Sequence, residues 1–131
     1  MSAPPASKYS GFVPGQHLIE AYGGGGFRFA GMSHRGSILA LPSGIYAWTA
    51  QRPQDITAQA LAPLFAEADA AVDLLIVGVG AELALLAAPL REKLRAAKTR
   101  FDPMATGLAV ATYNILLGER RRVAAAFLAV D

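Results

Sequence analysis

The sequence predicts an α/β fold in which helices pack on a mixed β-sheet. In residues 17–50, short alternating or β-rich segments are bounded by glycine and proline, as in strands joined by turns. After residue 55 the pattern changes to helical segments that alternate with short apolar runs. A run of strands that leads into β-α-β units is typical of a mixed sheet with helices packed on it.

The length and composition indicate one globular domain. The chain has 131 residues, 53% hydrophobic and 17% charged, so it can bury a substantial core. We expect a single α/β domain at residues 16–131 and a flexible arm at residues 1–15, which contain Pro4, Pro5, Pro14 and Gly15. The arm lacks the apolar stretch of a signal peptide, and no run reaches the roughly 20 apolar residues of a membrane span. We therefore expect a soluble, cytoplasmic protein, and the abundant alanine suggests a GC-rich bacterial genome.

Four segments in the first half predict an antiparallel meander. They read "HLIEAY", "FRFAGM", "SILALP" and "IYAWTA", and the breaks between them at Gly23–Gly26, His34–Gly36 and Pro42–Gly44 predict turns.

The second half begins with a helical segment and a buried strand. "ITAQALAPLFAEAD" is helical in composition, with Thr57 as the expected N-cap. Pro63 lies inside it, so either the helix kinks there or its regular part begins there. "VDLLIVGVG", residues 72–80, is an uninterrupted apolar run, which is typical of a strand buried on both faces of an α/β sheet.

The remaining elements follow in alternation. A second helix opens near Pro89 and runs through "LREKLRAAK", and "TRFDPM" is short and extended up to its proline. Thr106 is expected to cap a third helix, which Gly118 ends as the C′ residue. "RRVAAAFLAV" is the last predicted strand.

The third helix contains one amide whose position makes a sharp prediction. Leu108, Ala111, Ile115 and Leu116 are expected to form its apolar face, with Asn114 at the border of that face. A buried amide without partners costs about 1–3 kcal/mol, so Asn114 should bond the backbone of a neighbouring strand or loop.

Two glycine clusters raise the question of a phosphate site. A phosphate loop needs glycines directly before a helix, whereas Gly23–Gly26 lie between two alternating segments, which favours a hairpin or bulge. Gly78 and Gly80 follow the buried strand, but Leu83 stands where a dinucleotide fingerprint needs its third glycine, and Asp102 is the lone candidate for its acidic residue. A tight turn is therefore favoured over a ligand site there.

No catalytic, cofactor or metal site is predicted. There is no cysteine, the two histidines lack partners at metal-ligand spacing, and no serine lies in a nucleophile elbow. The net charge is only +2 and, apart from Arg120–Arg122, the basic residues are scattered, so nucleic acid is not an expected partner.

Three stretches carry a resemblance to a known family: "YGGGGFRFAG....GSILALP", "DLLIVGVG" and "MATGLAVATYNILLGERRRVAAAFLAV". In this order they resemble the small α/β family of domains of unknown function that includes mitochondrial complex I assembly factor 3 and the adipogenesis-associated Mth-type protein. The most specific part of the resemblance is one set of residues in the third stretch: Thr106-Gly107, Thr112-Tyr113-Asn114, Glu119 and Arg121-Arg122-Val123. The likeness covers the chain from about Leu18 to Val130.

The resemblance implies a three-layer fold, with a central mixed sheet, helices on one face and the N-terminal β-hairpins on the other. It also implies a protein without established catalytic activity that binds other proteins, as the mitochondrial assembly factor does. The family usually has Gly-Thr-Gly at the strand end, where this chain has Gly78-Val79-Gly80, so a hydroxyl that a ligand site would use is missing.

Two functional hypotheses follow. The first is a non-enzymatic interaction module that helps to assemble a membrane complex, such as a respiratory one. Its partner surface would be formed by the aromatic strands around Trp48 or by Arg121 and Arg122. The second is an enzyme or small-ligand protein that binds an anion in a crevice formed by residues 78–80, the helix start and one amide. The residues of that crevice are Gly78, Gly80, Thr106, Gly107 and Asn114. A homo-oligomer is compatible with the sequence.

Overall fold

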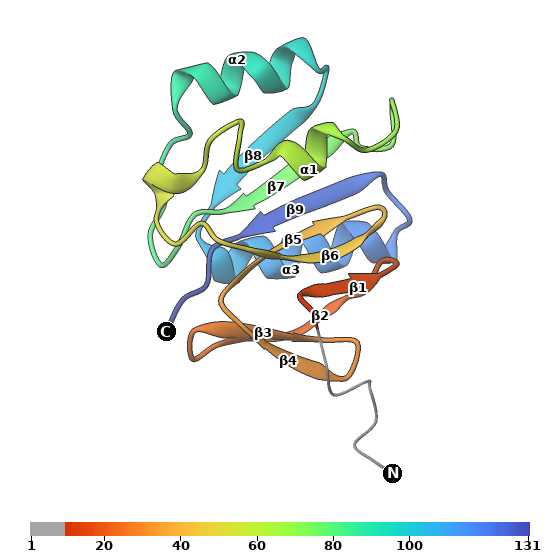
Figure 1. Cartoon of the computed structure of the whole chain (residues 1–131), viewed down its shortest axis with the longest axis vertical. Helices are drawn as coiled ribbons and strands as arrows, with labels where there is room; N and C mark the ends of the chain where they lie inside the picture. Colours follow the sequence, from red (N-terminus) through yellow and green to blue (C-terminus); the bar gives the residue numbers. More distant parts are fainter. Residues whose placement is uncertain (1–9) are drawn as a thin grey trace.

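The computed structural model describes residues 10–131, and in them the predicted mixed α/β fold is confirmed (Figure 1). A six-stranded mixed sheet has the order β1-β6-β5-β9-β7-β8, and a smaller antiparallel sheet has the order β2-β3-β4. The strands are β1 Phe12–Pro14, β2 Ile19–Gly23, β3 Gly26–Phe29, β4 Met32–Arg35, β5 Ser37–Leu41, β6 Gly44–Trp48, β7 Leu74–Gly78, β8 Arg100–Met104 and β9 Val123–Phe127. The helices are α1 Ala62–Phe65, α2 Ala88–Ala96 and α3 Thr106–Gly118, and a 3₁₀ turn spans Pro53–Asp55.

Strand β9 is the centre of the large sheet. It pairs in parallel with β7 and antiparallel with β5, and all five of its residues are buried. Strand β8 extends the parallel part at one edge, and β6 and β1 extend the antiparallel part at the other. Since β1 comprises Phe12–Pro14, the end of the predicted arm is part of the sheet, while residues 1–9 lie outside the described residues.

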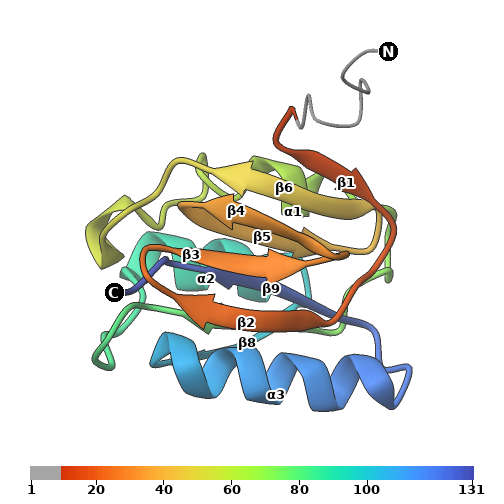
Figure 2. The same ribbon diagram turned by 90° about the horizontal axis from the view of Figure 1, so that it is seen from below.

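The helices cover both faces of the large sheet. Residues of α1 and α2, such as Leu64 and Leu90, pack on one face, whereas α3 and the small sheet share the other (Figure 2). The expectation of helices on one face and hairpins on the other therefore fails for α3. The reason is topological: the chain crosses from β7 to β8 through α2 and returns over β7 to β9 through α3. Right-handed crossovers in opposite directions put their helices on opposite faces.

The strands of the first half do not form one meander, because they divide between the two sheets at Gly36. The segment "FRFAGM" is also not one strand, since a turn at Ala30 and Gly31 separates β3 from β4. Both turn residues have positive φ, 52° and 73°, as a type I′ hairpin turn requires.

The four-glycine run is a hairpin, as predicted. Gly24 and Gly25, with φ of 61° and 84°, form the two-residue turn between β2 and β3. Gly26 is needed for a different reason, because a Cβ there would collide with the carbonyl oxygen of His34 on β4.

Proline positions two helices as the sequence indicates. Pro63 and Pro89 each occupy the first turn of their helix, so the regular part of the first helical segment begins near Pro63 without a kink. Thr57 caps only the preceding turn, where its hydroxyl accepts a hydrogen bond from the N–H of Ala60 at 3.1 Å.

The C′ position of helix α3 lies two residues later than predicted, at Arg120 instead of Gly118. Gly118 is its last helical residue, and Arg120, with φ of 61°, takes the left-handed position expected of a glycine. The N–H groups of Arg120 and Arg121 donate to the carbonyl oxygens of Leu117 and Leu116, which is the Schellman pattern.

The predicted apolar face of α3 is wrong. Leu108 and Ile115 are each 61% exposed, whereas Ala109, Val110 and Tyr113 are buried against the sheet. Apolar residues occur around nearly the whole helix, so periodicity alone could not choose the inner face. The choice is made by long-range contacts, among them the edge-to-face packing of Tyr113 on Phe127 at 5.6 Å.

Candidate functional site

A groove opens at the carboxyl ends of the parallel strands, where α3 begins. It has a volume of about 860 Å³ and lies between the loop after β7, the first turn of α3, the end of β2 and the segment after β9. Gly80 and Gly107 line it, together with the side chains of Tyr22, Leu83 and Leu108. This is the edge at which open α/β sheets commonly bind ligands, and we call the hollow the carboxyl-end groove.

Thr106 is buried beneath this groove rather than open to it. Its hydroxyl donates to the carbonyl oxygen of Leu128 at 2.8 Å and accepts from the N–H of Gly80 at 3.1 Å. Ala105 is the N-cap of α3, so the predicted N-cap role of Thr106 is wrong. The hydroxyl instead ties the loop after β7 to the end of β9, and no free hydroxyl is left for an anion.

The predicted crevice between Gly78 and Thr106 is filled by protein atoms. A Cβ on Gly78 would lie 3.1 Å from both Cα and Oγ1 of Thr106 and 3.2 Å from Cβ of Ala109. Gly78 therefore allows α3 to pack directly on β7, and it does not line the groove.

Tyr22 forms one wall of the groove and was not singled out by the sequence. Its ring lies on Gly107, where any Cβ would collide with the phenol hydroxyl. Gly107 thus makes room for a tyrosine that is 48% exposed. The sequence signal was the adjacency of Tyr22 to the glycine hairpin, but only the fold brings β2 against the start of α3.

Asn114 lies further along α3 and meets its prediction. Its Oδ1 accepts from the N–H of Ile19 and its Nδ2 donates to the carbonyl oxygen of the same residue, both at 2.8 Å. Ile19 begins β2, an outer strand of the small sheet, so the amide pairs with that edge as a neighbouring strand would.

Replacing Asn114 with Ala is expected to lower the free energy of unfolding by about 1–3 kcal/mol, because both polar groups of Ile19 lose their partner. Urea denaturation followed by circular dichroism measures the loss. Asn114→Asp is the matched control, since a carboxylate can still accept from the N–H but cannot donate to the carbonyl oxygen. An Ala variant as stable as the native chain would contradict the structural role.

The two arginines of the predicted surface lie at the other end of α3. Arg122 forms a bidentate ion pair with Asp73, with nitrogen–oxygen distances of 2.8–3.1 Å. Arg121 is exposed and has no ion pair within residues 10–131. The structure therefore separates the predicted site residues into the carboxyl-end groove, the Asn114 contact and an arginine corner formed by Arg120 and Arg121.

Acidic groups surround the groove. Glu82 and Asp131 line it without an ion pair in the described part of the chain, while Arg52 pairs with Asp55 at 3.5 Å. Hydrogen bonds from the backbone N–H groups of Gln51 and Arg52 hold the pKa of Asp55 below its ordinary value. The groove is therefore apolar with an acidic border, which does not suit an anion.

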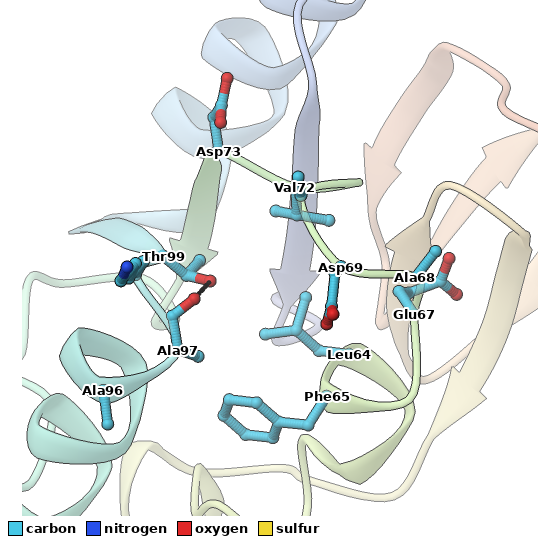
Figure 3. Close-up of a pocket in the computed structure, with 12 residues that line it drawn as sticks. Leu64, Phe65, Glu67, Ala68, Asp69, Val72, Asp73, Ala96, Ala97 and Thr99 are labelled. Atoms are coloured by element: carbon cyan, nitrogen blue, oxygen red, sulfur yellow. Dashed lines mark hydrogen bonds between the residues drawn. The ribbon is translucent and has the colours of Figure 1, made fainter.

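A second cavity, of about 570 Å³, lies at the opposite end of the sheet, between the ends of α1 and α2 and the segment that leads into β7 (Figure 3). Of its acidic residues, Glu67 accepts a hydrogen bond from Ser43 and Asp73 is paired with Arg122. No cluster of His, Cys, Asp or Glu in residues 10–131 could hold a metal ion.

Trp48 is not available to a partner. It is only 8% exposed, and its Nε1 donates to the carbonyl oxygen of Ala60 at 2.9 Å. A partner surface on the surrounding strands therefore cannot include the Trp48 side chain, which anchors the α1 segment to the large sheet. No helix within residues 10–131 is long and apolar enough to cross a bilayer.

Comparison with known proteins supports the resemblance noted above. A family model described as "Protein of unknown function (DUF498/DUF598)" matches residues 19–128. An uncharacterised protein of Rhodobacter capsulatus is 40% identical over 127 residues, which cover 96% of this chain and 92% of that protein. The crystal structure of an outer membrane protein from Bartonella henselae aligns with a TM-score of 0.86 at 45% identity, covering 90% of this chain and 98% of that one.

A named relative comes from Danio rerio. It is NADH dehydrogenase [ubiquinone] 1 alpha subcomplex assembly factor 3, which is 31% identical over 111 residues. The match covers 85% of this chain but 63% of the length of the fish protein.

Proposed function

This chain belongs to the DUF498/DUF598 family of proteins of unknown function, and from that membership we propose that it is a non-catalytic protein-interaction module that helps assemble a membrane-bound NADH dehydrogenase. The assembly role is suggested by the relatives named as assembly factors in Danio rerio and Xenopus tropicalis. The proposal assigns this chain a task in bringing subunits together rather than in electron transfer.

The single observation that carries the interaction role is the apolar lining of the carboxyl-end groove. Leu83 is 66% exposed and Leu108 is 61% exposed, and with Tyr22 they place three large apolar side chains in water around one concave surface. Exposed apolar side chains grouped around a hollow are typical of protein-binding surfaces. The partner that fits is an apolar segment of a dehydrogenase subunit, with basic residues beside Glu82 and Asp131.

The small-ligand hypothesis loses its main supports. It required a free hydroxyl at the helix start, but the Thr106 hydroxyl is already hydrogen-bonded to Gly80 and Leu128. It also placed Asn114 in the same crevice, whereas that amide is bound to Ile19.

The test is complementation of a strain from which the gene for this chain has been deleted. We expect the deletion to reduce the amount of fully assembled NADH dehydrogenase on native gels, and the native chain to restore it. Leu83→Glu should fail to restore assembly, because it puts a charge among the apolar side chains of the groove. Leu85→Glu is the matched control, since Leu85 is 80% exposed in the same loop but does not line the groove.

Two results would count against the proposal. If the deletion strain assembles the dehydrogenase normally, the assembly role is wrong. If Leu83→Glu restores assembly as well as Leu85→Glu does, the groove is not the surface used.

A further inference from the structure

The outer face of α3 is a second apolar surface. Leu108, Ala111, Ile115 and Gly118 follow one another at spacings of three, four and three residues, and all four are exposed. This is the spacing of the seam along which two helices pack. The inner face of α3 is buried against the sheet at Ala109, Val110 and Tyr113, so the helix has an apolar surface on both sides. A helix that is apolar all round is normally buried all round.

Neighbouring residues widen this seam. Strand β2 lies beside α3 (Figure 2), where Asn114 holds Ile19 and Tyr22 lies on Gly107. Leu18 and Tyr22 are 51% and 48% exposed. Four of the seven large apolar side chains exposed in residues 10–131 belong to α3, to β2 or to the residue directly before β2, and these are Leu18, Tyr22, Leu108 and Ile115.

The two ends of the seam have opposite charge. At the carboxyl end of α3, Arg120 and Arg121 outnumber Glu119, and none of them has an ion pair within residues 10–131. At the amino end, Glu82 and Asp131 border the groove, also without ion pairs in the described residues. When two copies of such a seam meet in antiparallel orientation, the basic end of each copy lies beside the acidic end of the other, so the two charge patterns are complementary.

We propose that the outer face of α3 binds the same face of a second copy of this chain, with the two helices antiparallel. In this arrangement Leu108 of one copy packs beside Ile115 of the other, and the small residues Ala111 and Gly118 let the helices approach closely. The basic end of each helix then lies beside the acidic end of its partner. The two-fold axis passes near Ala111 and Thr112, midway between Leu108 and Ile115 along the helix. The pairing does not rest on the assembly role, although it uses Leu108 and Tyr22, which also line the carboxyl-end groove.

The first experiment measures the mass of the purified chain by sedimentation equilibrium across a range of concentrations. A seam of one helix is a small interface, so we expect a dimer with a Kd of about 1–100 μM. Ile115→Glu should raise the Kd about a hundredfold or more, because two carboxylates would be forced into the seam. Leu85→Glu, which changes an exposed leucine outside α3 and β2, should leave the Kd unchanged. Circular dichroism verifies that both variants are folded.

The second experiment tests the antiparallel register through disulfide formation. The chain has no cysteine, so each single substitution supplies the one thiol. Ala111→Cys, near the axis, should form a disulfide-linked dimer rapidly on mild oxidation, because the two Cα atoms can come within about 7 Å. Gly118→Cys lies at the helix end, far from its own copy in the antiparallel pair, and should form the dimer at least tenfold more slowly.

The third experiment exchanges the charges at the two ends. Arg121→Glu should weaken the dimer, and the double variant with Arg121→Glu and Glu82→Arg should recover affinity, since each new charge meets its opposite on the other copy. A monomer at every concentration, or an unchanged Kd for Ile115→Glu, would overturn the proposal and leave the face to a different protein. Equal oxidation rates at the two cysteine positions would overturn the antiparallel register. All three experiments use the purified chain alone, so their failure is distinct from failure of the complementation test.

Discussion

Replacing Tyr113 with Ala is expected to lower the free energy of unfolding by about 3–5 kcal/mol, the largest effect of any substitution considered. Tyr113 is fully buried in the cluster that joins α3, the small sheet and the large sheet. Its ring meets that of Phe127 edge to face, with centroids 5.6 Å apart and an interplanar angle of 85°. Truncation would remove this contact and leave a cavity at the point where all three elements meet. Urea denaturation gives the difference directly.

Tyr113→Phe separates the ring from its hydroxyl. The hydroxyl is buried and has no hydrogen-bond partner within residues 10–131, and burial raises its pKa above the ordinary value of tyrosine. A buried polar group without a partner is unfavourable, so Phe should be neutral or stabilise the fold by up to about 1 kcal/mol. A loss of stability in the Phe variant would show that the hydroxyl has a partner in solution.

Replacing Thr106 with Val is expected to lower the free energy of unfolding by about 2–4 kcal/mol. The side chains are nearly the same size, but the hydroxyl is lost, so the carbonyl oxygen of Leu128 and the N–H of Gly80 both lose a partner. Each unpaired group in the interior costs about 1–3 kcal/mol. The N–H of residue 106 would still donate to the carbonyl oxygen of Gly80, but the N–H of Gly80 would have lost its acceptor. The amide of Gly80 should therefore exchange its hydrogen faster than in the native chain.

Thr106→Ser is the matched control for this substitution. It keeps the hydroxyl and removes one methyl group, so the loss should be near 1 kcal/mol and the exchange at Gly80 should stay slow. If Val and Ser destabilise the chain equally, the methyl group rather than the hydroxyl stabilises the start of α3.

The sequence alone was sufficient for the elements whose signal is local. Strand β7 is an uninterrupted apolar run, α2 begins at a proline, and Gly24 and Gly25 supply the positive φ that the β2–β3 turn needs. The partners of Asn114 could also be anticipated as backbone groups, because a partly buried amide requires them. These inferences hold because each depends on the chemistry of a few adjacent residues.

The distribution of the elements in space was decided by the tertiary structure. The alternating pattern of a strand does not indicate which sheet the strand joins. The chain passes from the small sheet to the large sheet at Gly36 because β5 pairs with β9, which lies about 90 residues further along the chain. Helix α3 is apolar on both sides, so its rotation is set by Tyr113 against Phe127 and by Asn114 against Ile19. The same rotation buries the Thr106 hydroxyl, leaves Leu108 and Ile115 in water, and thereby turns a predicted core face into a surface. Local periodicity reports how apolar a face is, whereas only long-range packing decides which of two apolar faces is turned inward.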